Sequence, residues 1–253
     1  MNTTLPQEMQ QHTYAIMNRV EDSHWWYVGR RVILESFLEG IVQNLKSKIQ
    51  NPKILDVGCG TGGNLEMLAK FGAVEGVDVS DDALEFCKSK GLTVHKGLAE
   101  SLPFGDESFD IVTALDVVEH LDDDIAGLKE MHRVLKTGGK TLIFVPAFMW
   151  LWGVQDDVSN HRIRYTKKQI AERLEKSGFT IERATYANIT FFAPILGGRT
   201  LMKLTGIKPE SENNVNVSAL NGVLGKLFGA ERFWLKNFNF PFGVSIVIVA
   251  KKI

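Results

Sequence analysis

The sequence has little of two features that would each identify a class of protein. Only two of its 253 residues are cysteine, Cys59 and Cys87, which is too few for a disulfide framework and gives no metal-binding spacing. The 29 Lys and Arg residues nearly balance the 30 Asp and Glu residues, so no bulk positive field attracts nucleic acid. We therefore expect a protein of the reducing cytoplasm with no nucleic-acid partner.

Long apolar segments are also missing. No run reaches the roughly 18–20 apolar residues that a membrane span needs. The first 20 residues are polar and lack the apolar core of a signal peptide. The sequence contains no internal repeat and no low-complexity tract, which favours one globular unit or one unit with an insertion.

What the sequence does contain is an alternation of strand-like and helix-like segments. Strands are predicted at 53–57, 74–80, 93–97, 109–118, 140–147, 179–186 and 243–252, and helices at 64–71, 81–90, 122–135 and 166–177. Residues 137–139, "TGG", are expected to turn the chain into the fifth strand. This alternation predicts an α/β fold with a mostly parallel sheet, covered on both faces. Residues 51–186 and 241–253 form the expected core, with a helical extension or lid at 1–50 and a helical insertion or cap at 187–240.

A glycine-rich loop, within "ILDVGCGTGG" (54–63), follows the first predicted strand. Gly58, Gly60 and Gly62 allow a sharp turn and a close approach of the backbone to a ligand, because no Cβ intervenes. In a doubly wound sheet, ligands bind at the carboxyl ends of the strands where the strand order reverses. Asp78 ends the second strand, where a carboxylate can accept both hydroxyls of a ribose. The pattern predicts a cofactor that contains a nucleoside.

Two kinds of cofactor fit the glycines. Gly58-x-Gly60-x-x-Gly63 with Asp78 about 20 residues on also satisfies the dinucleotide fingerprint. Asp56 distinguishes them, because a carboxylate beside the loop repels a pyrophosphate. The same carboxylate suits a cation such as the ammonium of a methionine moiety.

Four stretches together resemble the class I S-adenosylmethionine-dependent methyltransferases of type 11/12. They are "ILDVGCGTGGN", "EGVDVS", "LAESLPFGDESFDIVTALDVVEHLDD" and "EMHRVLKTGGKTLIFVPA", in family order and spacing. The resemblance implies a doubly wound, Rossmann-like sheet of seven strands, mostly parallel with the last strand antiparallel. It also implies S-adenosyl-L-methionine as the cofactor.

The resemblance further implies which residues contact this cofactor. Its amino-acid part is expected near Asp56 and the glycine loop, its ribose on Asp78, and its adenine near Ala99 and Glu100. The full set of expected contacts is Asp56, Gly58, Cys59, Gly60, Thr61, Gly62, Asn64, Asp78, Val79, Ala99, Glu100, Leu115, Asp116 and Val117. Leu98 departs from the family pattern, which often has an acidic residue there for the adenine amino group.

Two flanking motifs indicate a subgroup within this family. "EDSHWWYVGRR" (21–31) and "HRIRYT" (161–166) resemble a subgroup, many of them bacterial, associated with surface-polysaccharide or lipid-linked sugar pathways. Trp25, Trp26 and Tyr27 are expected either in a core or in a lid that excludes water. Arg30 and Arg31 are expected either to bind a substrate phosphate or carboxylate, or to lie on a helix surface.

The sequence offers several candidate catalytic groups. A hydroxyl acceptor needs a general base, for which His24, His120 and His161 are the candidates. Tyr165 is a candidate substrate contact, while Thr166 next to it is a helix N-cap. The expected acceptor is a small molecule, a sugar or a lipid-linked sugar, with O-methylation favoured. No residue spacing indicates a metal, and none is expected.

The insertion 187–240 allows two interpretations. Its apolar stripe is expected to bury itself in the same chain, or to meet a membrane at the inner face, a lipid-linked substrate or a partner subunit. The stripe comprises Leu220, Val223, Leu224, Leu227 and Phe228, with Trp234 and Phe238 as an exposed edge near the substrate entrance. The sequence does not determine the oligomeric state. A non-catalytic S-adenosylmethionine-binding regulator and an NAD-dependent oxidoreductase remain as alternative functions.

Overall fold

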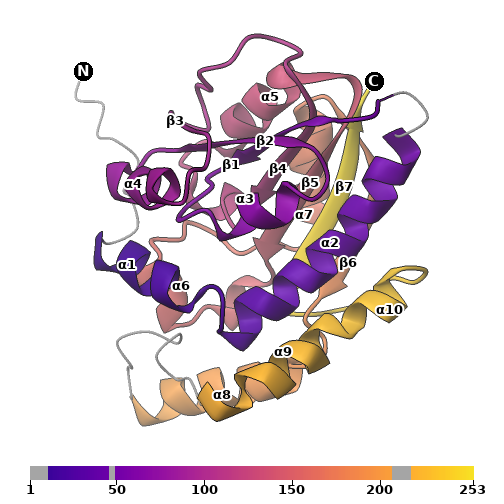
Figure 1. The fold of residues 1–253 in the computed structure, drawn as a ribbon. Helices are drawn as coiled ribbons and strands as arrows, with labels where there is room; N and C mark the ends of the chain where they lie inside the picture. The colour runs from indigo at the N-terminus through magenta and orange to yellow at the C-terminus, as the bar shows by residue number, and fades with distance from the viewer. Residues whose placement is uncertain (1–10, 46–48, 207–217) are drawn as a thin grey trace.

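A seven-stranded sheet forms the centre of the molecule (Figure 1). The computed structural model describes residues 11–45, 49–206 and 218–253. The strands are β1 (Lys53–Val57), β2 (Ala73–Asp78), β3 (Val94–Lys96), β4 (Phe109–Leu115), β5 (Leu135–Pro146), β6 (Phe179–Ala187) and β7 (Ser245–Lys252). They lie in the order β3-β2-β1-β4-β5-β7-β6, and β7 runs antiparallel to both of its neighbours. The predicted sheet, with its antiparallel last strand, is confirmed.

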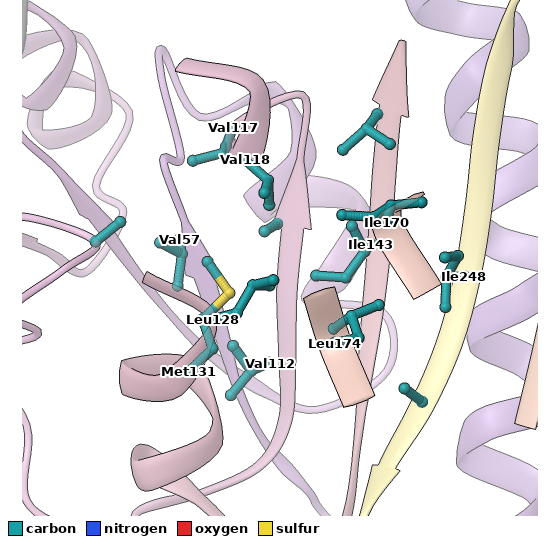
Figure 2. Close-up of a cluster of buried hydrophobic side chains, with 14 of the residues drawn as sticks. Val57, Val112, Val117, Val118, Leu128, Met131, Ile143, Ile170, Leu174 and Ile248 are labelled. Carbon is teal, nitrogen blue, oxygen red and sulfur yellow. The ribbon is translucent and has the colours of Figure 1, made fainter. Parts of the chain in front are cut away.

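Alternating side chains of the strands form two apolar cores, one on each face of the sheet. Leu55, Val112 and Ile143 belong to the core under α5 (Asp124–Val134) and α7 (Lys167–Lys176), part of which Figure 2 shows. Their neighbours Ile54 and Ile111 face the opposite way and pack with α2 (Trp25–Leu45). Because successive side chains of a strand point to opposite faces, buried strands of this kind are apolar at nearly every position.

The remaining helices are short, and several begin at residues that cap them. The helices not yet named are α1 (Gln11–Val20), α3 (Gly63–Leu68), α4 (Asp81–Ser89), α6 (Val154–Val158), α8 (Phe192–Thr205), α9 (Asn221–Gly229) and α10 (Glu231–Leu235), with 3-10 turns η1 (Val118–His120), η2 (Met149–Leu151) and η4 (Ser218–Leu220). Ser80 caps α4 by accepting from the Ala83 N–H. Thr166 and Gln169 form a capping box at α7, as the sequence indicated for Thr166.

The predicted extension and insertion are both helical where the structure describes them. Residues 1–10, 46–48 and 207–217 of those segments lie outside the described residues. The extension contributes α1 and α2, and α2 covers one face of the sheet (Figure 1). No helix in the described ranges combines the length and the apolar character needed to cross a bilayer.

One strand differs from its predicted bounds. The segment 137–139 does not turn the chain, because β5 already begins at Leu135 and continues through it. The pairing with β4 is irregular between Phe109 and Ile111, which accommodates the extra residues, and Gly138 has a φ of 83° there. The glycines therefore mark an irregularity within a long strand.

The interpretation that the apolar stripe of α9 is buried within the same chain is wrong for most of its members, while the alternative of a surface contact stays a prediction. Phe228 is fully buried against α2, but Val223 and Leu227 are 64% and 50% exposed. The buried face of α9 is instead made by Asn221, Gly225, Phe228 and Gly229. Two helices that approach this closely need small residues between them, whereas the sequence pattern weighed only large apolar side chains.

Glycines allow the close approach of α2 and α9. A Cβ at Gly29 of α2 would lie 2.6 Å from Cδ1 and 2.8 Å from Cβ of Phe228. We expect Gly29→Ala to lower the free energy of unfolding by about 1–3 kcal/mol, because the overpacked ring must shift. Urea denaturation measures this change.

Gly40→Ala is the matched control on the same helix. A Cβ there would meet no atom within 4 Å, so the substitution should be neutral or slightly stabilising. Equal stabilities of the two variants would contradict the packing described for α2 and α9.

Candidate active site

A cavity of about 630 Å³ opens at the carboxyl ends of β1, β2 and β4. The order of the strands reverses between β1 and β4, which is the position where sheets of this kind bind ligands. Helices α1, α2 and α8 supply its other walls, so the extension and the insertion both contribute to it.

The glycine loop brings bare backbone to the cavity wall. Gly58 and Gly60 have φ values of 68° and 53°, and a Cβ at Gly58 would overlap the Val117 side chain. Asp78 holds the loop in place by accepting from the Gly60 N–H at 2.8 Å and from the Ser80 N–H at 3.0 Å. Each carboxylate oxygen of Asp78 has a second lone pair, and the residue lines the cavity.

Most of the residues predicted to contact the cofactor line this cavity. They are Gly58, Cys59, Gly60, Asn64, Asp78, Val79, Ala99, Glu100, Leu115, Asp116 and Val117. Asp56, Thr61 and Gly62 do not line it. Thr61 is fully buried, and Gly62 is the N-cap of α3 with a φ of 95°.

Asp56 lies inside the molecule, which corrects its predicted contact with an ammonium group. Its carboxylate is fully buried and accepts from the Thr113 hydroxyl at 2.6 Å. Burial raises the pKa of Asp56 to about 7, although Thr113 and Arg30 oppose this shift. Along β1 its side chain points to the same face as Ile54, toward α2, and it does not line the cavity.

An ion pair between Arg30 of α2 and Asp116 after β4 forms the corner of the cavity nearest the loop. Arg30 is buried, so the expectation of a solvated helix-surface charge is wrong for it. Its guanidinium also donates to the Asn64 Oδ1 at 3.0 Å and lies 4.7 Å from the centre of the Trp26 ring. Arg31 lines the cavity too and donates to the Glu21 carbonyl at 2.6 Å.

The aromatic run at the start of α2 lies partly in a core and partly on the cavity wall, and its role as a lid stays a prediction. Trp25 and Trp26 pack against the apolar core under α2, and all three residues, Trp25, Trp26 and Tyr27, line the cavity. His24 precedes the helix, and its Nδ1 accepts from the Trp26 N–H at 3.3 Å. Burial lowers the pKa of His24, which stabilises the neutral ring at the start of the helix.

A cluster of histidines and carboxylates lies in the part of the cavity that η1 and α6 border. His161 Nδ1 is 2.7 Å from Asp156 Oδ1, and its ring meets the His120 ring edge-on with 4.6 Å between the centres. Burial alone would raise the pKa of Asp156, but hydrogen bonds from His161 and Arg164 hold it below its usual range. Because Asp156 is then a carboxylate, Nδ1 of His161 donates to it, and in the neutral form of the ring Nε2 carries the lone pair.

Tyr165 is a core residue, which corrects the prediction that it faces a substrate. Its side chain is fully buried, and its hydroxyl donates to Asp124 at 2.8 Å. The residue does not line the cavity. Within the "HRIRYT" motif, His161 and Arg164 therefore line the cavity, whereas Tyr165 is buried in the core.

Sequence reasoning missed two parts of the wall. Asp156 belongs to the five-residue α6, which is too short to give a helical period. Residues 195, 198, 199, 201 and 202 of α8 line the cavity, whereas Trp234 and Phe238 are exposed, as predicted, but do not line it. The apolar pattern of the insertion did not indicate which of its helices lines the cavity.

Comparison with known proteins supports the resemblance seen in the sequence. Residues 55–143 match a family model described as a methyltransferase domain. A protein of Chlorobaculum tepidum named demethylmenaquinone methyltransferase is 43% identical over 142 residues, which are 53% of this chain and 55% of that protein. The chain spans about half the length of the relatives of this name that it matches.

Solved structures share the fold at low sequence identity. A protein of Thermotoga maritima described as a "possible histamine N-methyltransferase" has a TM-score of 0.56 and 21% identity, over 96% of this chain and all of that chain. The cyclase SpnF has a TM-score of 0.54 and 21% identity, over 86% of this chain and 80% of that chain. Likeness at this level establishes the fold and leaves the reaction to the site.

Proposed function

Because the core of this chain is that of a class I S-adenosylmethionine-dependent methyltransferase, we propose that it transfers a methyl group from S-adenosylmethionine to an oxygen of a small-molecule acceptor. One observation carries the proposal. A single cavity joins the glycine loop and Asp78, which suit the cofactor, to the His161–Asp156 pair, which suits an acceptor hydroxyl.

The charges around the loop suit the two ends of the cofactor. Asp78 accepts the ribose hydroxyls, and Ala99 and Glu100 border the adenine. Methionine is a zwitterion, and the paired charges of Arg30 and Asp116 offer a cation for its carboxylate and an anion for its ammonium. In this proposal Asp116 takes the role that the sequence had given to Asp56.

The same charges disfavour a dinucleotide. A pyrophosphate carries two negative charges and would lie beside Asp116, while the methionine moiety of S-adenosylmethionine has no net negative charge, because its sulfur is a sulfonium. Catalysis is favoured over a purely regulatory role by the oriented imidazole of His161 within the same cavity, because binding the cofactor alone does not need it.

The reaction itself is an in-line displacement. An acceptor oxygen forms a bond to the methyl carbon as the carbon–sulfur bond breaks, and sulfur keeps the electron pair and becomes a neutral thioether. The acceptor hydroxyl must lose its proton as the new bond forms, and Nε2 of the neutral His161 ring is the base that accepts it. Holding the two reactants in line supplies much of the acceleration.

An apolar acceptor fits the outer part of the cavity. Ile195, Leu201 and Met202 of α8 form one side of it, and Leu201 and Leu204 continue as exposed apolar surface. The relatives named demethylmenaquinone methyltransferase act, by their name, on a quinone. We propose an acceptor with an apolar portion, such as a lipid-soluble phenol or quinol, and a lipid-linked sugar satisfies the same chemistry.

The cofactor assignment predicts a selective thermal shift. S-adenosylhomocysteine should raise the melting temperature, because it binds only the native state, and NAD should not.

Asp78→Ala should weaken S-adenosylhomocysteine binding on the order of ten- to a hundredfold by calorimetry, through lost charge-assisted hydrogen bonds of roughly 1.5–3 kcal/mol. Asp81→Ala on the exposed start of α4 is the control, and unchanged affinity of Asp78→Ala would place the ribose elsewhere.

The acceptor assignment predicts a defect at His161. His161→Ala should lower turnover on the best phenol or quinol acceptor by about a hundredfold or more, and it should leave S-adenosylhomocysteine affinity unchanged. His132→Ala is the control, because His132 packs against Phe179 away from the cavity. Turnover of His161→Ala at the wild-type rate would refute the placement of the acceptor.

The exposed face of the insertion predicts contact with a lipid surface. Phe233, Trp234 and Phe238 are exposed beside the cations Lys226 and Arg232, which suits anionic headgroups. Phe233→Asp with Trp234→Asp should abolish sedimentation with anionic vesicles and lower the melting temperature only slightly, because both side chains are at least half exposed.

Ile253→Asp is the control for vesicle binding. Ile253 is also an exposed apolar residue, and it lies at the C-terminus, away from α8, α9 and α10 (Figure 1). A wild-type chain that stays in the supernatant with anionic vesicles would remove the membrane from the proposal and leave a freely dissolved acceptor.

A further inference from the structure

Glu119 is a buried acid without a hydrogen-bonding partner. Its side chain is fully buried, and neither Oε1 nor Oε2 makes a hydrogen bond to any other described residue. As a carboxylate it would hold a buried charge that only its own backbone N–H and the nearby Arg164 offset, and as an acid it would hold a donor with no acceptor. Buried polar groups are rarely left in this state, because each costs free energy that a partner would recover.

Two histidines face this carboxylate. One ligand atom each from Glu119, His120 and His161 can be chosen so that all three lie within 4.8 Å of one another. His161 Nε2 is 3.9 Å from Glu119 Oε1, and both histidines line the cavity while Glu119 lies behind them. The cluster therefore has a closed inner side and an open side toward the acceptor.

Each histidine is also held from behind. Nδ1 of His161 is fixed by Asp156, which is itself held by Arg164 and by the Gly153 N–H. The His120 ring has a hydrogen bond with the Ser159 backbone. Metal-binding histidines almost always have such a partner, a carboxylate or a backbone carbonyl, on the ring nitrogen that does not bind the metal.

We propose that Glu119, His120 and His161 bind one divalent transition-metal ion of the Zn²⁺ type at the acceptor end of the cavity. Two imidazoles and one carboxylate are a common three-ligand set of catalytic metal sites, which leave a position open toward substrate. Nitrogen ligands disfavour Mg²⁺, which takes oxygen donors. Sequence reasoning expected no metal because Glu119 and His120 are far from His161 along the chain.

The geometry requires a small closure. Two ligands at zinc bond lengths lie about 3.4 Å apart in a tetrahedral site, against 3.9 Å between His161 and Glu119 and distances within 4.8 Å among all three ligand atoms. Burial raises the pKa of Glu119 well above its usual value, with Asp116 adding to the effect. A dication here would stabilise the carboxylate and supply the missing partner.

The ion would give the acceptor end its chemistry, an inference that rests on the proposed function. The open position would take the acceptor hydroxyl oxygen and lower its pKa, and the proton would leave to solvent water. His161 would then act as a ligand, which accounts for its fixed tautomer without making it the proton acceptor.

Direct metal binding tests the inference without activity. The purified chain is stripped with chelator and dialysed against Zn²⁺, and bound metal is measured per chain. We expect one equivalent, a rise in melting temperature with Zn²⁺ and not with Mg²⁺, and a tetrahedral or five-coordinate visible spectrum with Co²⁺. Glu119→Gln should weaken Zn²⁺ binding by about a hundredfold or more, at a melting temperature of the stripped chain that is not lower than that of the wild type.

His95→Ala is the control for adventitious binding. His95 and Glu75 form a half-exposed pair at the edge of the sheet, 2.7 Å apart, and could hold Zn²⁺ weakly. Loss of the bound equivalent in His95→Ala, or full retention in Glu119→Gln, would overturn the inference, as would a chain that takes up no Zn²⁺.

The two proposals fail separately. Binding of S-adenosylhomocysteine without stoichiometric Zn²⁺ overturns the metal site and leaves the methyltransferase assignment intact. Stoichiometric, Glu119-dependent Zn²⁺ binding without S-adenosylhomocysteine binding overturns the methyltransferase assignment and leaves the metal site intact.

Discussion

The ion pair between Arg30 and Asp116 connects the N-terminal helix to the point where the sheet changes strand order. Burial raises the pKa of Asp116, and Arg30 opposes that shift, so the carboxylate depends on the arginine for its charge. Removing one partner of a buried pair typically costs about 3–5 kcal/mol, because the other charge is left uncompensated. Helix α2 is therefore an integral wall of the cavity, and its aromatic residues and the α8–α10 segment are arranged around it.

A second group of charges organises the opposite end of the cavity. Asp156 receives hydrogen bonds from His161, Arg164 and the Gly153 backbone, and this fixes α6 beside η1. The Arg30–Asp116 pair and the Asp156 group thus form two hydrogen-bonded networks at two parts of the cavity wall. The α2 helix supports one network, and the loop after β5 supports the other.

Sequence patterns predicted the fold well because the information is local. Strand β1 has the predicted bounds, and the order of strands and helices is as expected, since apolar periodicity and capping residues act within a few positions of the chain. The glycine loop and Asp78 were found for the same reason, because each follows directly on a strand end. The sequence also predicted more of the cavity wall near the glycine loop than of the wall that η1, α6 and α8 form.

What the sequence by itself determined is an α/β core that resembles methyltransferase domains, and the identity of the backbone turns at its strand ends. Only the tertiary structure decided which neighbours each polar side chain meets. In the tertiary structure Asp56 and Tyr165 are fully buried, and Glu119 Oε1 lies 3.9 Å from His161 Nε2. Those contacts join residues far apart in the chain, and their geometry depends on how helices pack over the sheet, which no local pattern encodes.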